Sequence, residues 1–295
     1  MSLIFQDDQI YMMPVFFGPQ PGHLRPDLPG QPGKCMNDYY QPADVHTISV
    51  TYETEREVLE RMIPDCFTLN DPYVSVNITE FTNLGWQAGK TYNLIGITCP
   101  VHFKGERDDL DGDLVLVMFE NQTAPILGGR ETMGYGKLYC DIPPIQHYEN
   151  RYLGYAVSEG FRFIKMDIDV TQEAPDLEAI KRNEARTSGK FSYKYLMATK
   201  EKDEDPALNY TRADVQYPTI LPVWKKPDDY PYDFMDPEVT YCSGSVAFIR
   251  PEWEDMPQIW NIAWGLNDLK CKRVLGAKLV HCNDPCHYTD CYRLR

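Results

Sequence analysis

The sequence lacks the segments that would carry a chain across or into a membrane. No stretch approaches the ~18 consecutive apolar residues that a transmembrane helix requires. The first residues, MSLIFQDDQIYMMP, contain Asp7 and Asp8 and have neither a basic start nor a small-residue cleavage site, which argues against a signal peptide. These absences predict a soluble, cytoplasmic protein with no membrane partner.

Positive charge is also scarce. The chain has 29 Lys and Arg against 44 Asp and Glu, a formal net charge of -15. No run of Lys or Arg with interleaved aromatic residues provides the electrostatic surface that nucleic acid requires. We therefore expect no nucleic-acid partner, and we expect the chain to bind small molecules or other copies of itself.

Several common enzyme motifs are missing. The sequence has no G-x-S-x-G, no H-E-x-x-H, no P-loop and no G-x-G-x-x-G after a strand, so it predicts no nucleotide cofactor and none of the enzyme classes that those motifs mark.

The cysteines do not form a recognisable pattern either. Their odd number, nine, in a long chain without a signal peptide favours reduced thiols over a disulfide framework. The segment HCNDPCHYTDC holds Cys282, Cys286 and Cys291 beside two histidines and could bind zinc. Its C-x3-C-x4-C spacing lacks the paired C-x2-C of convincing zinc sites, so we predict free thiols and no metal.

What is present is a β-rich globular pattern, with 43% hydrophobic residues. Residues 1–45 are rich in Pro and Gly and predict an extended arm, and residues 46–295 predict a single domain. Segments dense in β-branched and aromatic residues predict strands at 46–53, 73–81, 92–103, 113–120, 155–170, 191–199, 242–250 and 273–282.

Helices are few and short in this interpretation. Residues 54–63 predict a helix with a capping box at Thr54 and Glu57 and an apolar side formed by Val58, Leu59 and Met62. Residues 174–185 predict a second helix, while 253–266 could be a buried helix or an irregular cover. The acidic, Pro-rich stretch 200–240 predicts surface loops. The fold class is therefore mainly β (α+β).

One lysine is placed unusually. In GRETMGYGKL, residues 129–138, Lys137 follows two glycines and a tyrosine, with Met133, Tyr135 and Leu138 as apolar neighbours. A desolvated lysine can act as an amine nucleophile. Composition alone favours the alternative, an exposed lysine that starts a strand.

Four other residues could contribute to chemistry. Arg130 and Glu131 either line a pocket or anchor the loop through buried ion pairs, and these alternatives are equally weighted. His102 and Glu120 lie in adjacent predicted strands and could do acid/base work, although a solvated strand face is the favoured interpretation for both.

The segment GRETMGYGKLYCDI resembles the G-R-E-x-x-G-Y-P-K-K-L-x-D-I signature of the acetoacetate decarboxylase superfamily. The similarity extends through TISVTYETEREVLERMIPDCFTLNDPYVSV and through YNLIGITCPVHFKGERDDLDGDLVLVMFENQTAPILGGRE. The resemblance implies an antiparallel β-cone or closed barrel. It also implies that Lys137 forms a Schiff base with a keto substrate, a lysine chemistry for which acetoacetate decarboxylase is a known example.

The chain departs from that family at charged positions. The family's second lysine is Leu138 here, and its proline is Gly136. The glutamate that decarboxylases place some forty residues before the lysine falls on Leu94, and a second acidic position falls on Asn77. The family's N-terminal pocket arginine falls near Val45 or His46.

The resemblance therefore implies a Schiff-base lyase with a less charged pocket. We expect Tyr135, Leu94, Leu138 and Met133 to line it, with Arg130 and Glu131 fixing its floor. Decarboxylation of a β-keto acid is the leading reaction. The alternatives are a lysine-dependent aldolase or dehydratase acting on a larger keto substrate, and a non-catalytic small-molecule binding protein. The family's habit and the N-terminal arm favour a homo-oligomer.

Overall fold

The computed structural model describes residues 5, 11–17, 40–200, 212–285 and 287–295. Fourteen strands in this part of the chain form one sheet, and the helices are short, which confirms the mainly-β α+β class. No helix among the described residues is long and apolar enough to cross a membrane. Seven cysteines in this part of the chain are free thiols, at positions 66, 99, 140, 242, 271, 282 and 291.

The strands occupy most of the chain from residue 43 onward. The first seven are β1 (Ala43–Glu53), β2 (Phe67–Leu69), β3 (Tyr73–Leu84), β4 (Lys90–Lys104), β5 (Asp109–Glu120), β6 (Lys137–Tyr139) and β7 (Gln146–Tyr148). The others are β8 (Arg151–Ser158), β9 (Phe161–Asp169), β10 (Gly189–Met197), β11 (Ala213–Pro222), β12 (Glu238–Phe248), β13 (Arg273–Asp284) and β14 (Tyr292–Arg293).

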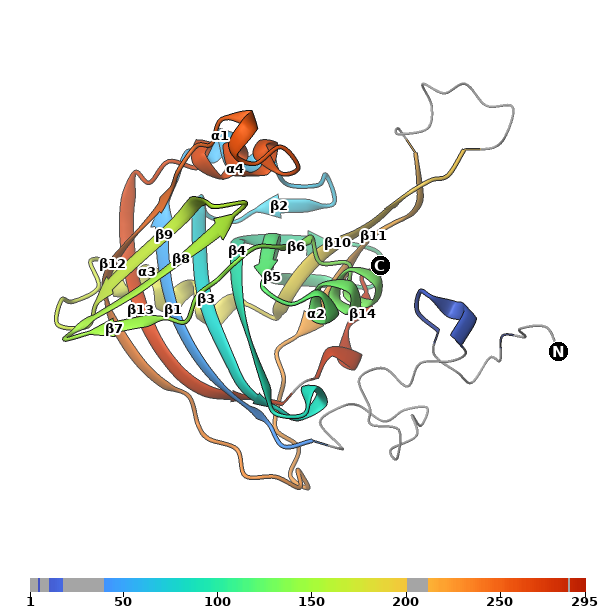
Figure 1. Cartoon of the computed structure of the whole chain (residues 1–295), viewed down its shortest axis with the longest axis horizontal. Helices are drawn as coiled ribbons and strands as arrows, with labels where there is room; N and C mark the ends of the chain where they lie inside the picture. Colours follow the sequence, from blue (N-terminus) through green and yellow to red (C-terminus); the bar gives the residue numbers. More distant parts are fainter. Residues whose placement is uncertain (1–4, 6–10, 18–39, 201–211, 286) are drawn as a thin grey trace.

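The helices connect the strands. They are α1 (Arg56–Glu60), α2 (Thr123–Gly128), α3 (Leu177–Arg186) and α4 (Trp260–Asp268). A π-helical turn spans Gly129–Met133, and 3-10 turns lie at Val15–Phe17, Gly85–Gln87, Trp253–Asp255 and Tyr288–Asp290. Figure 1 shows α1 and α4 together at one end of the long strands β13, β1, β3 and β4.

The sequence predicts an antiparallel β-cone or closed barrel, and the sheet differs from this description in two details, its closure and its strand directions. The strand order is β14-β11-β10-β5-β4-β3-β1-β13-β12-β9-β8-β7, which has two ends, while β2 pairs with β4 and β6 with β5. Two pairs, β10 with β5 and β5 with β6, are parallel, so the sheet is mixed. A single antiparallel bridge between Asp141 and Val157 links the segment after β6 to β8. The sheet therefore curves without closing (Figure 1).

Strands β1, β3, β4 and β5 separate their side chains onto two faces, as the period of two requires. On the core face, Ile48, Ile78, Ile95 and Phe119 lie opposite one another in a row and are fully buried. They belong to one large apolar cluster that also includes Leu59 and residues of α4. Burial of this face is the main source of stability in the fold.

The opposite face, called the polar face below, carries Thr, Ser and Asn side chains from β1 and β3. Two rows cross it from strand to strand. The first is Thr47, Thr79, Leu94 and Glu120, and the second is Ser49, Asn77, Gly96, Met118 and Lys137. The polar face therefore places Lys137 and Glu120 on the same side of the sheet as Leu94 and Asn77.

Helix α3 covers part of the polar face. The Asp176 side chain caps its N-terminus by accepting from the Ala179 amide at 3.1 Å, and Lys278 of β13 pairs with Glu184 at 2.6 Å. This confirms the helix predicted at 174–185.

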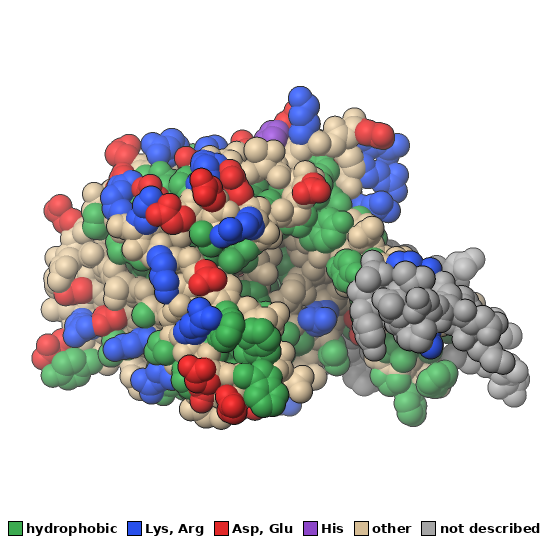
Figure 2. Space-filling model, turned by 90° about the horizontal axis from the view of Figure 1, so that it is seen from above, with side chains coloured by type: hydrophobic (Ala, Val, Ile, Leu, Met, Phe, Trp, Pro, Cys, Tyr) green, Lys and Arg blue, Asp and Glu red, His purple; other side chains and the backbone are tan. Residues whose placement is uncertain are grey.

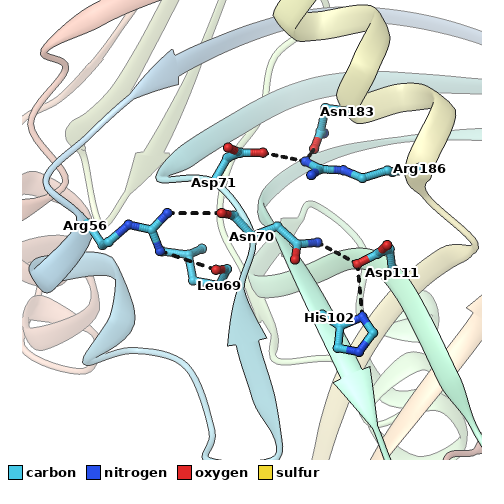
Figure 3. A network of polar contacts seen from close by, with 8 residues as sticks. All are labelled: Arg56, Leu69, Asn70, Asp71, His102, Asp111, Asn183 and Arg186. Atoms are coloured by element: carbon cyan, nitrogen blue, oxygen red, sulfur yellow. Dashed lines mark hydrogen bonds and ion pairs between the residues drawn. The ribbon is translucent and has the colours of Figure 1, made fainter.

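A polar network holds the C-terminal end of α3 (Figure 3). Arg186 pairs with Asp71 at 2.5 Å, the Asn70 amide donates to Asp111 at 2.8 Å, and the ring Nδ1 of His102 lies 3.2 Å from the same carboxylate oxygen. His102 also pairs with Asp109 at 3.2 Å. Its ring is half-buried within this network, whereas a solvated face was the favoured expectation.

Three local predictions differ from the structure. The capping box at Thr54 and Glu57 is wrong, because α1 begins after Glu55 and no side chain caps it. Leu59 is nevertheless buried as expected.

The loops predicted at 200–240 include strand β11, whose pairing with β10 overrides its Pro content. Residues 201–211 lie outside the described part of the chain. Residues 253–266 form a 3-10 turn followed by α4, so both alternatives are partly realised.

Most of the predicted N-terminal arm lies outside the described residues, so the division into 1–45 and 46–295 stays a prediction. Strand β1 begins at Ala43. The tail segment that was weighed as a zinc site includes Cys286, which is not described, so the prediction of no metal there stays a prediction. No group of three or more His, Cys, Asp or Glu in the described part of the chain is arranged to hold a metal ion. The surface of the described part carries Lys, Arg, Asp and Glu side chains interspersed over the face shown in Figure 2.

Candidate active site

Lys137 is reached by a tight crossover from β5. The chain leaves β5 at Glu120, passes through α2 and the π-helical turn, and returns in β6 parallel to β5, with Lys137 opposite Met118. Gly134 ends the turn in the left-handed region at φ 79°, where glycine carries no Cβ penalty. This return places the lysine beside the strand from which the crossover started.

Backbone hydrogen bonds fix the crossover from three sides. Arg130 donates to the Lys137 carbonyl at 2.9 Å. Ser192 of β10 donates to the Gly134 carbonyl at 2.6 Å, and Thr219 of β11 donates to the Met133 carbonyl at 2.7 Å. Because these donors come from the π-helical turn itself and from strands β10 and β11, the crossover is held at three points up to the start of β6.

The Lys137 side chain is buried against a carboxylate. Lys137 is 6% exposed and Glu120 is 0% exposed. The Lys137 Nζ lies 2.8 Å from Glu120 Oε1, and it donates to the Pro125 carbonyl at 3.1 Å. The exposed lysine favoured by composition is therefore wrong, and so is the solvated face favoured for Glu120.

Burial raises the pKa of the Glu120 carboxyl, and the nearby Lys137 ammonium only partly opposes this shift. The second carboxyl oxygen, Oε2, is buried and has no hydrogen-bond partner among the described residues. A buried carboxylate with one unpaired oxygen favours its protonated form. Glu120 therefore combines a raised pKa with a position in hydrogen-bond contact with the lysine amine.

Gly129 allows the lysine to adopt this position. A Cβ at Gly129 would lie 2.4 Å from Lys137 Cε, 2.6 Å from Cδ and 2.7 Å from Nζ. The aliphatic part of the lysine therefore lies directly on the backbone of the turn, and any residue other than glycine at 129 would occupy its place.

Met133 and Tyr135 form an apolar wall beside the lysine. Both are buried in a cluster with Val115, and the Tyr135 ring centroid lies 5.9 Å from the Lys137 Nζ. The Tyr135 hydroxyl has no partner among the described residues, and burial raises its pKa.

Residues 25–229 of the chain match the acetoacetate decarboxylase (ADC) family. The chain belongs to the acetoacetate decarboxylase family. The match covers both the crossover with Lys137 and the strands that form the polar face.

Curated and solved relatives agree with this assignment. Acetoacetate decarboxylase 3 of Mesorhizobium japonicum is 32% identical over 111 residues, which are 37% of this chain and 40% of the relative. The alignment thus spans less than half the length of the curated relative. A solved structure of acetoacetate decarboxylase superposes with a TM-score of 0.59 and 15% identity, covering 86% of this chain and 90% of that one. At this identity the likeness concerns the fold.

The enduracididine biosynthesis enzyme MppR has a similar fold. In complex with the condensation product of pyruvate and imidazole 4-carboxaldehyde, it superposes with a TM-score of 0.51 and 13% identity, covering 83% of this chain and 86% of that one.

The residues at which the sequence differs from the decarboxylase signature do not all lie on the same face of the sheet as Lys137. Leu94 is directly opposite Glu120, with both side chains on the polar face. Asn77 lies in the row that ends at Lys137. Leu138 is opposite Phe119 on the other face and packs against the core cluster, away from the lysine's side of the sheet. His46 stacks on His281 at a centroid distance of 4.1 Å.

Arg130 and Glu131 are not side by side in a strand, because both belong to the π-helical turn. The Arg130 side chain is exposed and holds the backbone of Lys137, and Glu131 is half-buried with its carbonyl accepting from Lys194. Neither side chain forms an ion pair with another described residue.

The sequence indicated acid/base work as one alternative for Glu120 but favoured a solvated face, and it did not pair Glu120 with Lys137. The signal was its place as the last residue of β5, directly before the crossover that ends at the lysine. The obstacle was the extra residue Leu116 in β5, opposite the Ile97/Thr98 step of β4, which changes which side chains share a face.

Proposed function

We propose that this chain is a lyase in which Lys137 forms a Schiff base with a keto compound, and that decarboxylation of a β-keto acid is its main reaction. The observation that carries the proposal is the buried contact of 2.8 Å between the Lys137 Nζ and Glu120, located in the family's lysine motif. An amine attacks a carbonyl only through its lone pair, so it needs a partner that can remove its proton. Glu120, with its raised pKa, is that partner.

The chemistry follows from this proton exchange. Glu120 holds the proton, and the Lys137 Nζ lone pair attacks the keto carbon to form a C–N bond while the carbonyl π pair moves to the oxygen. One amine proton then passes from the nitrogen to that oxygen, which gives the neutral carbinolamine. Glu120 then returns the proton to the carbinolamine oxygen, which leaves as water and gives the iminium. The bond to the substrate carboxylate breaks, CO2 leaves, and its electron pair moves into the iminium to form an enamine. Protonation of the enamine carbon and hydrolysis then release the ketone and the free lysine.

Burial favours the carbon–carbon cleavage. A carboxylate placed beside Met133 and Tyr135 loses hydration, while the neutral CO2 that it becomes does not need it.

A lysine-dependent aldolase or dehydratase is the second candidate. The observation that favours it is the fold likeness to MppR, which binds the condensation product of pyruvate and imidazole 4-carboxaldehyde in its solved complex. The apolar residue at Leu94 and the neutral residue at Asn77 would suit a substrate without the short β-keto carboxylate. A non-catalytic binding protein is the third candidate.

Borohydride trapping separates these candidates. The protein is incubated with acetoacetate and with a panel of larger keto acids and aldehydes, reduced with borohydride, and searched by mass spectrometry for an adduct on Lys137. An adduct accompanied by CO2 release supports the decarboxylase. An adduct without CO2 release selects the aldol or dehydration chemistry.

The matched control is Lys165→Ala, which removes an exposed lysine of β9. We expect Lys137→Ala to abolish the adduct and Lys165→Ala to leave it unchanged. If no carbonyl compound is trapped and Lys137→Ala binds ligands like the parent, the chain is a binding protein and the enzyme proposal is wrong.

A further inference from the structure

A second feature of the polar face is a cavity of about 200 Å³ between the sheet and α3. Hydroxyl and amide groups line its floor, contributed by Ser49, Thr51, Ser75, Asn77 and Thr98. The Thr51 and Ser75 hydroxyls bond to each other at 2.9 Å. The side chains of Ser49 and Asn77 have no hydrogen-bond partner among the described residues, so both are available to a ligand.

The charges around this cavity are already paired. Lys190 lies 2.8 Å from Asp113, and Lys278 lies 2.6 Å from Glu184. Because each cation at the cavity wall has its own carboxylate, the cavity offers neutral donors and acceptors to a ligand and no unpaired charge. This lining suits hydroxyl groups better than a carboxylate or an alkyl chain.

The register of the sheet connects the cavity with the lysine. Ser49 and Asn77 at the cavity floor lie in the row that continues through Gly96 and Met118 to Lys137. Asn77 and Lys137 are three strand spacings apart, which is about 14 Å. A short keto acid bound at the lysine would leave the cavity empty, whereas a longer chain could reach it.

Gly96 leaves the space between them open. A Cβ at Gly96 would have one heavy atom within 4 Å, the Leu94 Cδ2 at 3.7 Å. Met118, the next residue in the row, packs against the cluster of Val115, Met133 and Tyr135 and has a flexible side chain. Space above Gly96 and an adaptable methionine form a passage along the polar face.

We infer that the cavity under α3 binds the distal part of the keto substrate, and that this part is a hydroxylated, uncharged chain. The inference rests on the Schiff base proposed at Lys137 and assigns its substrate class: a keto compound with a polyol tail. The carbonyl lies at Lys137, the chain passes over Gly96, and the hydroxyls bind Ser49 and Asn77.

The test uses the trapping reaction with ketones that share a methyl ketone end. Acetone has no tail, and 1-deoxyfructose, 2-hexanone and 5-oxohexanoate carry a polyol, an alkyl and a carboxylate-ended tail of matched length. Adduct formation on Lys137 is compared between parent and variant for each ketone, so that differences in intrinsic carbonyl reactivity cancel.

Two variants address the passage and the cavity. Gly96→Val places a β-branched side chain in the passage, and we expect the 1-deoxyfructose adduct to fall about tenfold more than the acetone adduct. Asn77→Leu removes a hydrogen-bonding group, and we expect it to lower the 1-deoxyfructose adduct about fivefold more than the 2-hexanone adduct. Gly265→Ala in α4, whose Cβ would contact Met62 Cε at 3.6 Å, is the control and leaves all adducts unchanged.

The outcomes separate this inference from the proposed function. Equal losses of the acetone and 1-deoxyfructose adducts in both variants, or an unchanged 1-deoxyfructose adduct, overturn the polyol assignment while the Schiff base stands. The polyol assignment is also overturned if the parent traps 2-hexanone or 5-oxohexanoate more readily than 1-deoxyfructose and Asn77→Leu lowers that adduct by the same factor. A parent that traps none of the four ketones overturns the proposed function, and this inference with it.

Discussion

Gly129→Ala is the sharpest test of how the lysine is held. The added Cβ would lie 2.4 Å from Lys137 Cε, whereas ordinary contact begins at 3.4 Å, so the side chain must move by about 1 Å. The atoms in conflict are the far end of one side chain and not backbone, so the lysine yields before the crossover does. Its Nζ then leaves the positions 2.8 Å from Glu120 and 3.1 Å from the Pro125 carbonyl.

The expected effect is larger on reactivity than on stability. Overpacking a buried site costs ~1–3 kcal/mol, and a side chain that can move keeps the cost near ~1 kcal/mol. A displacement of ~1 Å from the productive geometry can lower a rate by ~100-fold, equivalent to ~2.7 kcal/mol of transition-state stabilisation. We therefore expect Gly129→Ala to remain folded and to be trapped with acetone about 100-fold more slowly.

The assay is the rate of borohydride-trapped adduct formation on Lys137, measured beside urea unfolding of the same preparations. Gly265→Ala in α4 is the matched control, since its Cβ would have only an ordinary contact of 3.6 Å with Met62 Cε. Trapping of Gly129→Ala at the parent rate would refute the argument that the lysine depends on this glycine. A loss of stability as large as the loss of reactivity would show instead that the crossover, and not the lysine, absorbs the strain.

Three further predictions concern the same site. Burial raises the pKa of Glu120 in the folded state above its ordinary 4.5, so the folded chain binds this proton more tightly than the unfolded chain does. The stability that Glu120 contributes therefore falls as pH rises from about 4.5 through the folded pKa. The stability of the parent minus that of Glu120→Gln, from urea unfolding, should decline over this range; a constant difference contradicts the raised pKa. Exchanging the two residues, Leu94→Glu with Glu120→Leu, should retain more trapping with acetone than Glu120→Leu alone, and equal activities would show that only position 120 can serve the lysine. Thr219→Val should lower the free energy of unfolding by ~1–3 kcal/mol because the Met133 carbonyl loses its buried donor; a change near zero in urea unfolding would mean that the carbonyl finds another partner.

The sequence predicts the strands better than it predicts the closure of the sheet. Alternation along β1, β3 and β4 is a local property, so the amino-acid pattern by itself places Ile48 and Ile78 on one face. The strand order depends on long-range pairing, such as the parallel pairing of β10 with β5, which no local pattern contains. That is why the closure and the two parallel pairs were not foreseen, although the mainly-β, acetoacetate decarboxylase-like fold was confirmed.

The amino-acid composition could not predict that Lys137 is buried, for a similar reason. Most lysines are exposed, and the residues next to Lys137 in sequence do not bury it. Burial comes from α2 and the π-helical turn folding back over β5, with Gly129 giving the side chain room. The resemblance at residues 129–142 singles out Lys137, and the fold places Glu120, which lies outside the motif, 2.8 Å from its Nζ.

Glu120 changes how the loss of a charged residue at position 94 is interpreted. The family glutamate falls on Leu94, which suggests a pocket that has lost a carboxylate. Leu94 and Glu120 are directly opposite on antiparallel strands, with both side chains on the polar face, and the Cα atoms of such a pair are only about 4.5–5.5 Å apart. Glu120 therefore offers the lysine a carboxylate from the position directly opposite Leu94, and its Oε1 lies 2.8 Å from the Lys137 Nζ. The carboxylate is on β5, beside the lysine, and apolar Leu94 is on β4, next to the open space above Gly96. The lysine thus keeps a proton acceptor while the passage toward the α3 cavity has no charge of its own, which is the arrangement that an uncharged, extended keto substrate would require.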